Sequence, residues 1–128
     1  MNNIYISYKQ TWVSDEDLQK DLKFLRKEIE KLWNKTFVYY FDADSDLDPQ
    51  NLVYKFYEEI KKSDIFFCFL NYKKKSEWQL LELWIAYSLW KKIILLVNER
   101  VKESYYLAYW MADHIFYFKN LKKDFPKI

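Results

Sequence analysis

The chain of 128 residues contains no glycine. Average usage of about 7% would give roughly nine glycines in a chain of this length. Phosphate-binding loops of the Walker and G-x-G-x-x-G kinds need glycine at fixed places, so the sequence excludes nucleotide binding by either loop. The same chain carries six tryptophans, and several of them stand where glycine would suit the expected local structure better.

Cysteine, histidine and long apolar runs are also scarce. Cys68 is the only cysteine, which excludes an internal disulfide and fits a reducing cytoplasm. His114 is the only histidine and has no cysteine or histidine partner, so we expect no metal. The longest apolar runs, residues 65–70 and 93–97, are too short to cross a bilayer, and we expect no signal peptide. These features predict a cytoplasmic protein without a cofactor or a membrane partner.

Core-forming side chains, in contrast, are abundant. Apolar residues make up 51% of the chain and aromatic residues 22%, enough for one domain spanning residues 1–128. The 21 basic and 19 acidic residues nearly balance, which argues neither for nor against nucleic acid. Because no exposed set of rings for base stacking can be identified, we expect no nucleic acid polymer as a partner.

Apolar runs alternate with amphipathic stretches throughout the chain. Predicted strands cover residues 3–8, 36–41, 65–70, 93–97 and 115–118, and predicted helices begin after Ser14 and Asp48 and cover 77–90 and 103–111. This order predicts an α/β fold, a flavodoxin-like three-layer sandwich with a five-stranded parallel sheet in the order 2-1-3-4-5. Its ligand site should lie beyond the carboxyl ends of the first and third strands, which points to Tyr8 and to the loop from Asn71 to Ser76.

Glu82 is the leading candidate for a reactive residue. It stands in a predicted helix whose neighbouring residues, 80–86, are otherwise almost all apolar. A carboxylate on an apolar helix is costly to bury unless it is paired, so its presence requires a reason. From the residues alone, a catalytic role and a salt bridge to a lysine at the helix rim remain equally open.

Aspartates recur at every second position of residues 42–48. The spacing matches the first half of an EF-hand calcium loop, but Leu47 replaces the turn glycine and Val53 replaces the bidentate glutamate. We therefore interpret the run as a solvated loop that ends in a helix cap. Asp42, at the tip of the second predicted strand, is the member expected to reach the pocket.

Residues 81–86 read Leu-Glu-Leu-Trp-Ile-Ala and are followed by Lys91. With glycine in place of Trp84 and Trp90, this stretch is similar to the E-L-G-x-A…G-K signature of the nucleoside 2-deoxyribosyltransferase superfamily. The resemblance extends over nearly the whole chain and includes that superfamily's first strand, the entry to its third strand, and its closing helix and strand, at residues 4–6, 60–65 and 107–118.

This resemblance implies that Glu82 attacks the anomeric carbon of a small-molecule nucleoside or nucleotide. The resulting covalent (deoxy)ribosyl-enzyme is then resolved by another base or by water. It also implies a homo-oligomer, because members of the superfamily often complete each other's pockets. Near the predicted switch point, we expect Ser7, Tyr8, Asp42, Asn71 and Ser76 to bind the substrate, with Asp42 as a candidate acid for the departing base.

Three helper positions depart from the superfamily pattern. Ser76 stands where many members have an aspartate, and Phe56 falls near the place of a second aspartate. Tyr106 falls at the place of a pocket asparagine. The resemblance therefore implies a conserved type of nucleophile surrounded by altered neighbours.

A sister resemblance leads to a second hypothesis. Residues 4–8 resemble the "F-I-S-Y" opening of TIR domains, and residues 76–83 resemble their S-x-W-x-x-x-E-L element. This resemblance implies an NAD glycohydrolase or cyclase that uses the same Glu82, with NAD as the small-molecule partner. A third hypothesis is a non-catalytic TIR-like interaction module. We favour the transferase side because that resemblance continues through residues 84–92 and into the C-terminal part.

Three tryptophans occupy places that favour glycine. Trp90 follows the last apolar residue of a predicted helix, where a left-handed glycine commonly ends the helix. Trp84 falls where we expect helix and sheet to pack closely, and Trp78 where a loop should approach the substrate. Some bacteria decode UGA as glycine, whereas another code table reads it as tryptophan. Recoded glycines and an adapted aromatic-rich sequence both remain open.

Overall fold

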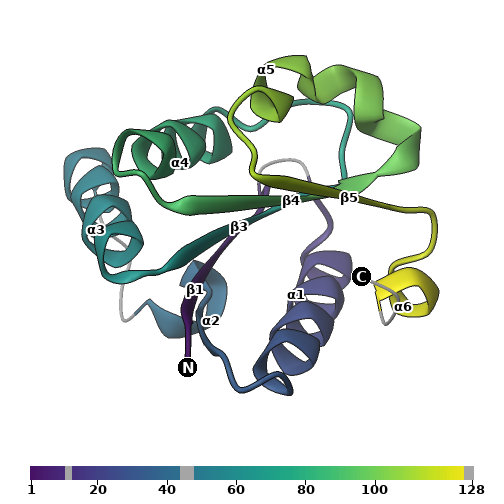
Figure 1. The fold of residues 1–128 in the computed structure, drawn as a ribbon, viewed down its shortest axis with the longest axis horizontal. Helices are drawn as coiled ribbons and strands as arrows, with labels where there is room; N and C mark the ends of the chain where they lie inside the picture. The colour runs from purple at the N-terminus through teal and green to yellow at the C-terminus, as the bar shows by residue number, and fades with distance from the viewer. Residues whose placement is uncertain (11–12, 44–47, 126–128) are drawn as a thin grey trace.

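The computed structural model describes residues 1–10, 13–43 and 48–125. Its parallel sheet has the strand order β2-β1-β3-β4-β5 (Figure 1), which confirms the predicted flavodoxin-like topology. The strands are β1 (Asn3–Ser7), β2 (Lys35–Phe37), β3 (Ile65–Leu70), β4 (Lys92–Asn98) and β5 (His114–Phe118). The helices are α1 (Asp15–Glu30), α2 (Tyr39–Asp42), α3 (Pro49–Lys62), α4 (Glu77–Ser88), the 3₁₀ helix η1 (Glu99–Tyr105), α5 (Tyr106–Tyr109) and α6 (Leu121–Asp124).

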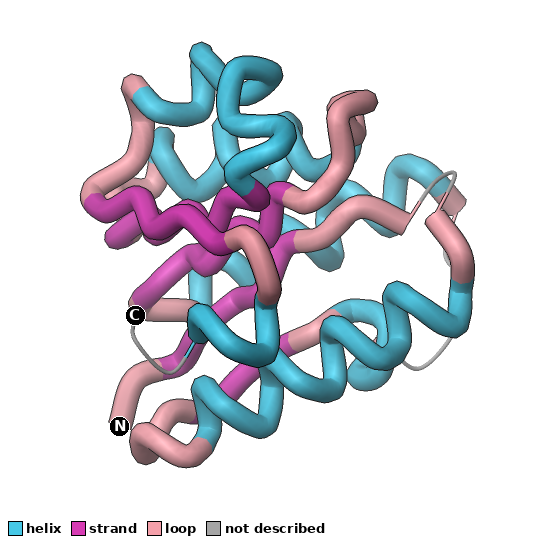
Figure 2. The backbone as a smooth tube through the Cα atoms, turned by 90° about the vertical axis from the view of Figure 1, so that its right-hand side faces the viewer, coloured by secondary structure: helices cyan, strands magenta, loops and turns pink. Residues whose placement is uncertain are grey.

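Helices cover both faces of the sheet, as the view turned by 90° shows (Figure 2). Alternate strand residues point to opposite faces. Tyr5 belongs to the core shared with α3, α4 and α5, whereas Ile4 and Ile6 belong to the core shared with α1. Two separate apolar cores therefore hold the sheet in the middle layer. No helix in the described ranges is long and apolar enough to cross a membrane.

The helices α3 and α4 each begin with a side chain that caps the first turn. The Asp48 carboxylate accepts a hydrogen bond from the Asn51 backbone N–H at 2.9 Å, and Pro49 occupies the first position of α3. Ser76 caps α4 in the same way, by accepting from the Gln79 backbone N–H at 3.2 Å. These caps fix where α3 and α4 begin beside the switch point.

The predicted second strand is too long. The structure ends β2 at Phe37 and forms the short helix α2 from Tyr39 to Asp42. The Asp42 carboxylate accepts from the Val38 backbone N–H at 2.8 Å, and the Asp42 backbone N–H donates to the Val38 carbonyl at 2.9 Å. This turn satisfies the backbone locally, so the apolar run leaves the sheet. The predicted helix 103–111 is likewise replaced by η1 and α5.

The surroundings expected for two of the tryptophans are wrong. Trp84 is exposed instead of packing against the sheet, because Gln79, Glu82, Leu83 and Ala86 form the buried face of α4. Trp78 lies within the first turn of α4, not in a loop. At position 90, in contrast, the backbone is left-handed, as predicted.

Candidate functional site

Glu82 lies on the face of α4 that covers the carboxyl end of β1. Its side chain is buried, and its carboxylate accepts two hydrogen bonds from hydroxyl groups. The Tyr5 phenol donates to Oε2, and the Ser7 hydroxyl donates to Oε1 at 3.0 Å. Residues 5 and 7 are two apart on a strand and so point to the same face. Hydroxyl groups, instead of the rim lysine considered from the sequence, hold this carboxylate.

Burial raises the pKa of Glu82 to about 7, although the hydrogen bonds from Tyr5 and Ser7 oppose that increase. The pKa of Tyr5 is raised by burial and then by the neighbouring Glu82 carboxylate, so its phenol keeps its proton. The pKa of Tyr8 is raised for the same two reasons. The site thus contains a carboxyl group that ionises near neutral pH, next to phenols that remain hydrogen-bond donors.

Gln79 is a site residue that sequence reasoning missed. Its Nε2 donates to the Phe69 carbonyl at 2.8 Å and to the Ser7 carbonyl at 3.3 Å, and so it joins the ends of β3 and β1. Gln79 and Glu82 are three residues apart and share one helix face. The sequence could have indicated this role, because Gln79 is a second polar residue on the apolar helix, three positions before Glu82. The side chain fixes α4 over the switch point and thereby positions Glu82.

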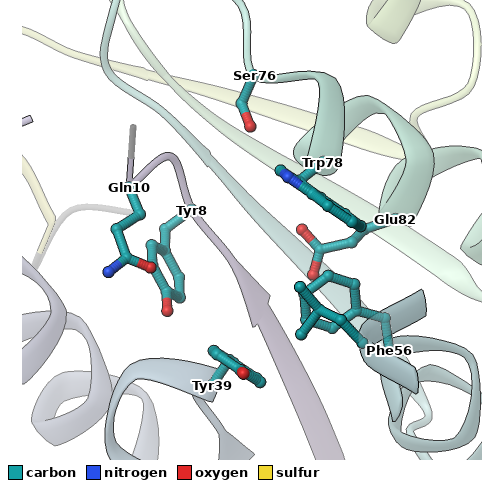
Figure 3. A pocket seen from close by; sticks show the side chains of 8 residues that line it. Tyr8, Gln10, Tyr39, Phe56, Ser76, Trp78 and Glu82 are labelled. Carbon is teal, nitrogen blue, oxygen red and sulfur yellow. The ribbon is translucent and has the colours of Figure 1, made fainter. Parts of the chain in front are cut away.

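A cavity of about 360 Å³ opens beside the Glu82 carboxylate. It is lined by Tyr8, Gln10, Tyr39, Leu52, Phe56, Ser76, Trp78 and Glu82. Figure 3 shows the carboxylate directed between the rings of Phe56 and Trp78, with Tyr8 and Gln10 on the opposite side. Phe56 packs edge-to-face on Tyr39 and on Trp78, with ring centroids 5.4 and 5.9 Å apart. An aromatic wall next to one buried acid suits a ligand with a planar ring and a polar part.

The structure brings together three of the predicted binding residues. Ser7 contacts the Glu82 carboxylate directly, and Tyr8 and Ser76 line the cavity. Phe56 also lines the cavity, so two of the positions that depart from the superfamily pattern, 56 and 76, are part of its wall. Tyr106, the third such position, lies on α5 with an exposed side chain.

Asp42 and Asn71 lie elsewhere. The Asp42 carboxylate is paired with Arg26 of α1 and does not line the cavity beside Glu82. The short helix α2 turns it toward α1, which the predicted straight strand would not do. Asn71 accepts a hydrogen bond from Asn98 Nδ2 at 2.8 Å and lines a different depression, together with Arg100. Asp44 and Asp46 of the aspartate run lie outside the described residues.

The described part of the cavity wall contains one carboxylate, that of Glu82. Within residues 1–10, 13–43 and 48–125, histidine, cysteine and acidic side chains do not gather in groups of three or more that could hold a metal ion. What the described arrangement offers chemically is therefore one buried, oriented carboxyl group facing an aromatic cavity.

Comparison with known proteins finds similarity at the level of structure only. No family model and no curated protein matches the sequence. The CMP N-glycosidase of Clostridium botulinum superimposes with a TM-score of 0.74 at 19% identity, over 98% of this chain and 95% of that one. A 2-deoxyribosyltransferase from Bacillus psychrosaccharolyticus gives 0.62 at 18% identity, over 94% and 88% of the two chains. One from Leishmania mexicana gives 0.57 at 18% identity, over 76% and 65%. The chain therefore has the fold of the nucleoside 2-deoxyribosyltransferases.

Proposed function

We propose that this protein cleaves the N-glycosidic bond of a nucleoside or nucleotide, with Glu82 as the nucleophile. The observation that carries the proposal is the buried Glu82 carboxylate, which Tyr5 and Ser7 hold at the edge of an aromatic cavity. Active sites commonly contain groups with shifted pKa values, and in parallel sheets ligands commonly bind at the switch point. Proteins of the same fold that are named as a CMP N-glycosidase and as 2-deoxyribosyltransferases add support.

In the proposed reaction, an oxygen of the ionised Glu82 carboxylate forms a bond to the anomeric carbon. The C–N bond breaks at the same carbon, and its electron pair leaves with the base. The product is a glycosyl ester on Glu82. Attack by water then gives the free sugar and restores the carboxylate, whereas attack by a second base gives a new nucleoside. Each step replaces one bond at the anomeric carbon by another without oxidation or reduction, so the reaction needs no redox cofactor.

The neighbouring residues orient the Glu82 carboxylate and bind the substrate. Tyr5 and Ser7 each donate to one oxygen of Glu82 and so fix the carboxylate plane. Tyr8 and Ser76 present hydroxyl groups to the cavity for the sugar, and Phe56 presents a ring surface for the base. The departing base must gain a proton. Asp42 is bound by Arg26 away from the cavity, so we expect that proton to come from solvent.

The test is release of free base, followed by chromatography, from CMP, from a 2′-deoxynucleoside with and without an acceptor base, and from NAD. Glu82→Gln should abolish release and keep the fold. Glu77→Gln is the matched control, because Glu77 lies about 1.4 turns earlier on the same helix with an exposed side chain. Glu77→Gln should retain the wild-type rate within about twofold, as expected for a surface change away from the site.

Each arm of this assay separates one hypothesis from the others. Base release from CMP or the deoxynucleoside that depends on Glu82 supports the proposal. Release from NAD alone would support a TIR-type glycohydrolase instead. Activity that survives in Glu82→Gln would rule out Glu82 as nucleophile. Absence of release from every substrate, in a protein that is folded and binds none of them, would favour the non-catalytic interaction module.

A further inference from the structure

The backbone is left-handed at two tryptophans. Trp33 has φ 64° and Trp90 has φ 60°, and they are the only residues with positive φ in the described part of the chain. Both follow a long helix, α1 and α4 respectively. A left-handed residue brings Cβ too close to the following carbonyl oxygen, so glycine is the residue that visits this region routinely. A bulky aromatic residue at positive φ is an outlier.

Position 90 forms the helix-ending motif for which glycine is the usual residue. The Trp90 N–H donates to the Tyr87 carbonyl at 3.1 Å, and the Lys91 N–H donates to the Ala86 carbonyl at 3.0 Å. This pair of bonds is the Schellman pattern, with position 90 at its left-handed C′ place. The fold thus requires the left-handed conformation at residue 90, whatever side chain stands there.

Position 33 ends α1 in a related way. The Trp33 N–H donates to the Glu30 carbonyl at 3.2 Å, and the Asn34 side chain donates to the Ile29 carbonyl at 3.1 Å. These bonds satisfy carbonyls of the last helical turn, and residue 33 then turns the chain toward β2. The same requirement for a left-handed residue therefore occurs twice, and tryptophan fills both places.

Five tryptophan side chains are exposed to solvent, which is unusual for this residue. Trp33 is 81% exposed and Trp90 94% exposed. Trp84 and Trp110 are also exposed, and Trp78 is partly exposed, at 37%. Tryptophan is on average a highly buried residue. Among the described residues, the buried large aromatic side chains are phenylalanines and tyrosines, namely Tyr5, Tyr105, Phe56, Phe66, Phe67, Phe69 and Phe118.

We infer that the natural protein carries glycine at positions 33, 78, 84, 90 and 110, and that these codons are UGA. One reassigned codon, read as glycine in the cell and as tryptophan in the written sequence, explains three observations together. These are the absence of glycine from 128 residues, the two left-handed tryptophans and the exposed indoles. Adaptation of an aromatic-rich sequence would explain none of the left-handed positions.

The inference changes the cavity beside Glu82. Trp78 forms part of the cavity wall and packs edge-to-face on Phe56. Glycine at position 78 removes that indole, so the cavity is wider between Ser76 and Phe56 and the backbone of the first turn of α4 is open to a ligand. This consequence concerns ligand access, and the inference itself does not depend on the proposed reaction.

The deciding experiment is peptide mass spectrometry of the protein isolated from the cells that make it, with coverage of the five positions. Glycine masses at all five positions are expected. Tryptophan at any one of them would overturn the inference. Because the readout is residue mass, its result is independent of whether the protein cleaves a nucleoside.

A second measurement tests the physical argument on the chain as written here. Trp33→Gly and Trp90→Gly should each raise the melting temperature by roughly 3–8 °C, by relief of left-handed strain. Trp110→Gly is the matched control, because Trp110 is also exposed but has φ −70° in the right-handed region; it should give no increase. An unchanged or lower melting temperature for Trp33→Gly or Trp90→Gly would contradict the inference.

Discussion

The Tyr5 phenol donates a hydrogen bond to Oε2 of Glu82, although the two residues are 77 positions apart in the chain. Tyr5 stands on the central strand β1 and Glu82 on α4, so the contact exists only when α4 is docked on the sheet. Ser7, two residues along the same strand, holds the other carboxylate oxygen. The orientation of the candidate nucleophile is therefore a property of the folded core.

Tyr5→Phe should make Glu82 harder to ionise. A hydrogen bond to a charged group contributes about 1.5–3 kcal/mol, which corresponds to about one to two pH units. In wild type, activity that needs ionised Glu82 should rise with pH through about 7, the pKa set by burial against the two hydroxyl donors. In Tyr5→Phe this rise in kcat/KM should move to higher pH. The Tyr109 phenol donates to the Lys102 carbonyl and not to Glu82, so Tyr109→Phe should not shift the pH profile. Equal profiles for wild type, Tyr5→Phe and Tyr109→Phe would refute the prediction.

Stability should depend on pH through Glu82. The pKa is raised from 4.5 in the unfolded chain to about 7 in the folded one, chiefly by burial. Below pH 4.5 both states are protonated; between 4.5 and 7 only the folded state keeps the proton, so stability falls as pH rises, by about 3 kcal/mol in total. Glu82→Gln lacks this loss.

Urea unfolding at pH 4 and pH 8 measures this dependence directly. The free energy of unfolding of Glu82→Gln minus that of wild type should be about 3 kcal/mol larger at pH 8 than at pH 4, because only the wild type loses stability as pH rises. The same difference at both pH values would show that burial of Glu82 does not raise its pKa.

Asp42→Asn should leave base release within about twofold of wild type, as expected for a residue outside the site. The Asp42 carboxylate pairs with Arg26 and caps the turn at Val38, so the substitution should instead lower the free energy of unfolding by about 1 kcal/mol. Kinetics and urea unfolding on one protein preparation check both parts. A more than tenfold loss of rate without loss of stability would return Asp42 to the reaction as an acid.

Self-association is expected even with glycine at the five tryptophan positions. Large side chains that remain exposed include Tyr54, Tyr87, Tyr106 and Leu107, and exposed apolar surface commonly marks an interface. Light scattering at micromolar concentration should give a dimer or a larger assembly. A monomer in the glycine form would contradict this expectation and would attribute any association of the tryptophan form to its indoles.

The sheet order could be predicted from the sequence because it depends on alternation of apolar runs, which is a property of the whole chain. The location of Glu82 followed from the same alternation and the switch-point rule, whereas the apolar surroundings of this acid left a salt bridge at the helix rim equally open. Sequence reasoning failed for Asp42, whose carboxylate caps the short helix α2 at Val38 and pairs with Arg26, a residue that becomes its neighbour only in the folded chain. It also failed for Gln79, whose partners Ser7 and Phe69 become neighbours only in the folded sheet.

The central claim is a covalent bond between Glu82 and the sugar, and intact mass spectrometry tests it most directly. The wild-type protein, mixed with a nucleoside or CMP and quenched in acid within the first turnover, should gain the mass of one glycosyl group, located by peptide mapping on the segment that contains Glu82. Glu82→Gln should gain none, and Glu77→Gln should behave as wild type. Release of base by the wild type with no adduct at any quench time, or an adduct on another residue, would contradict the account.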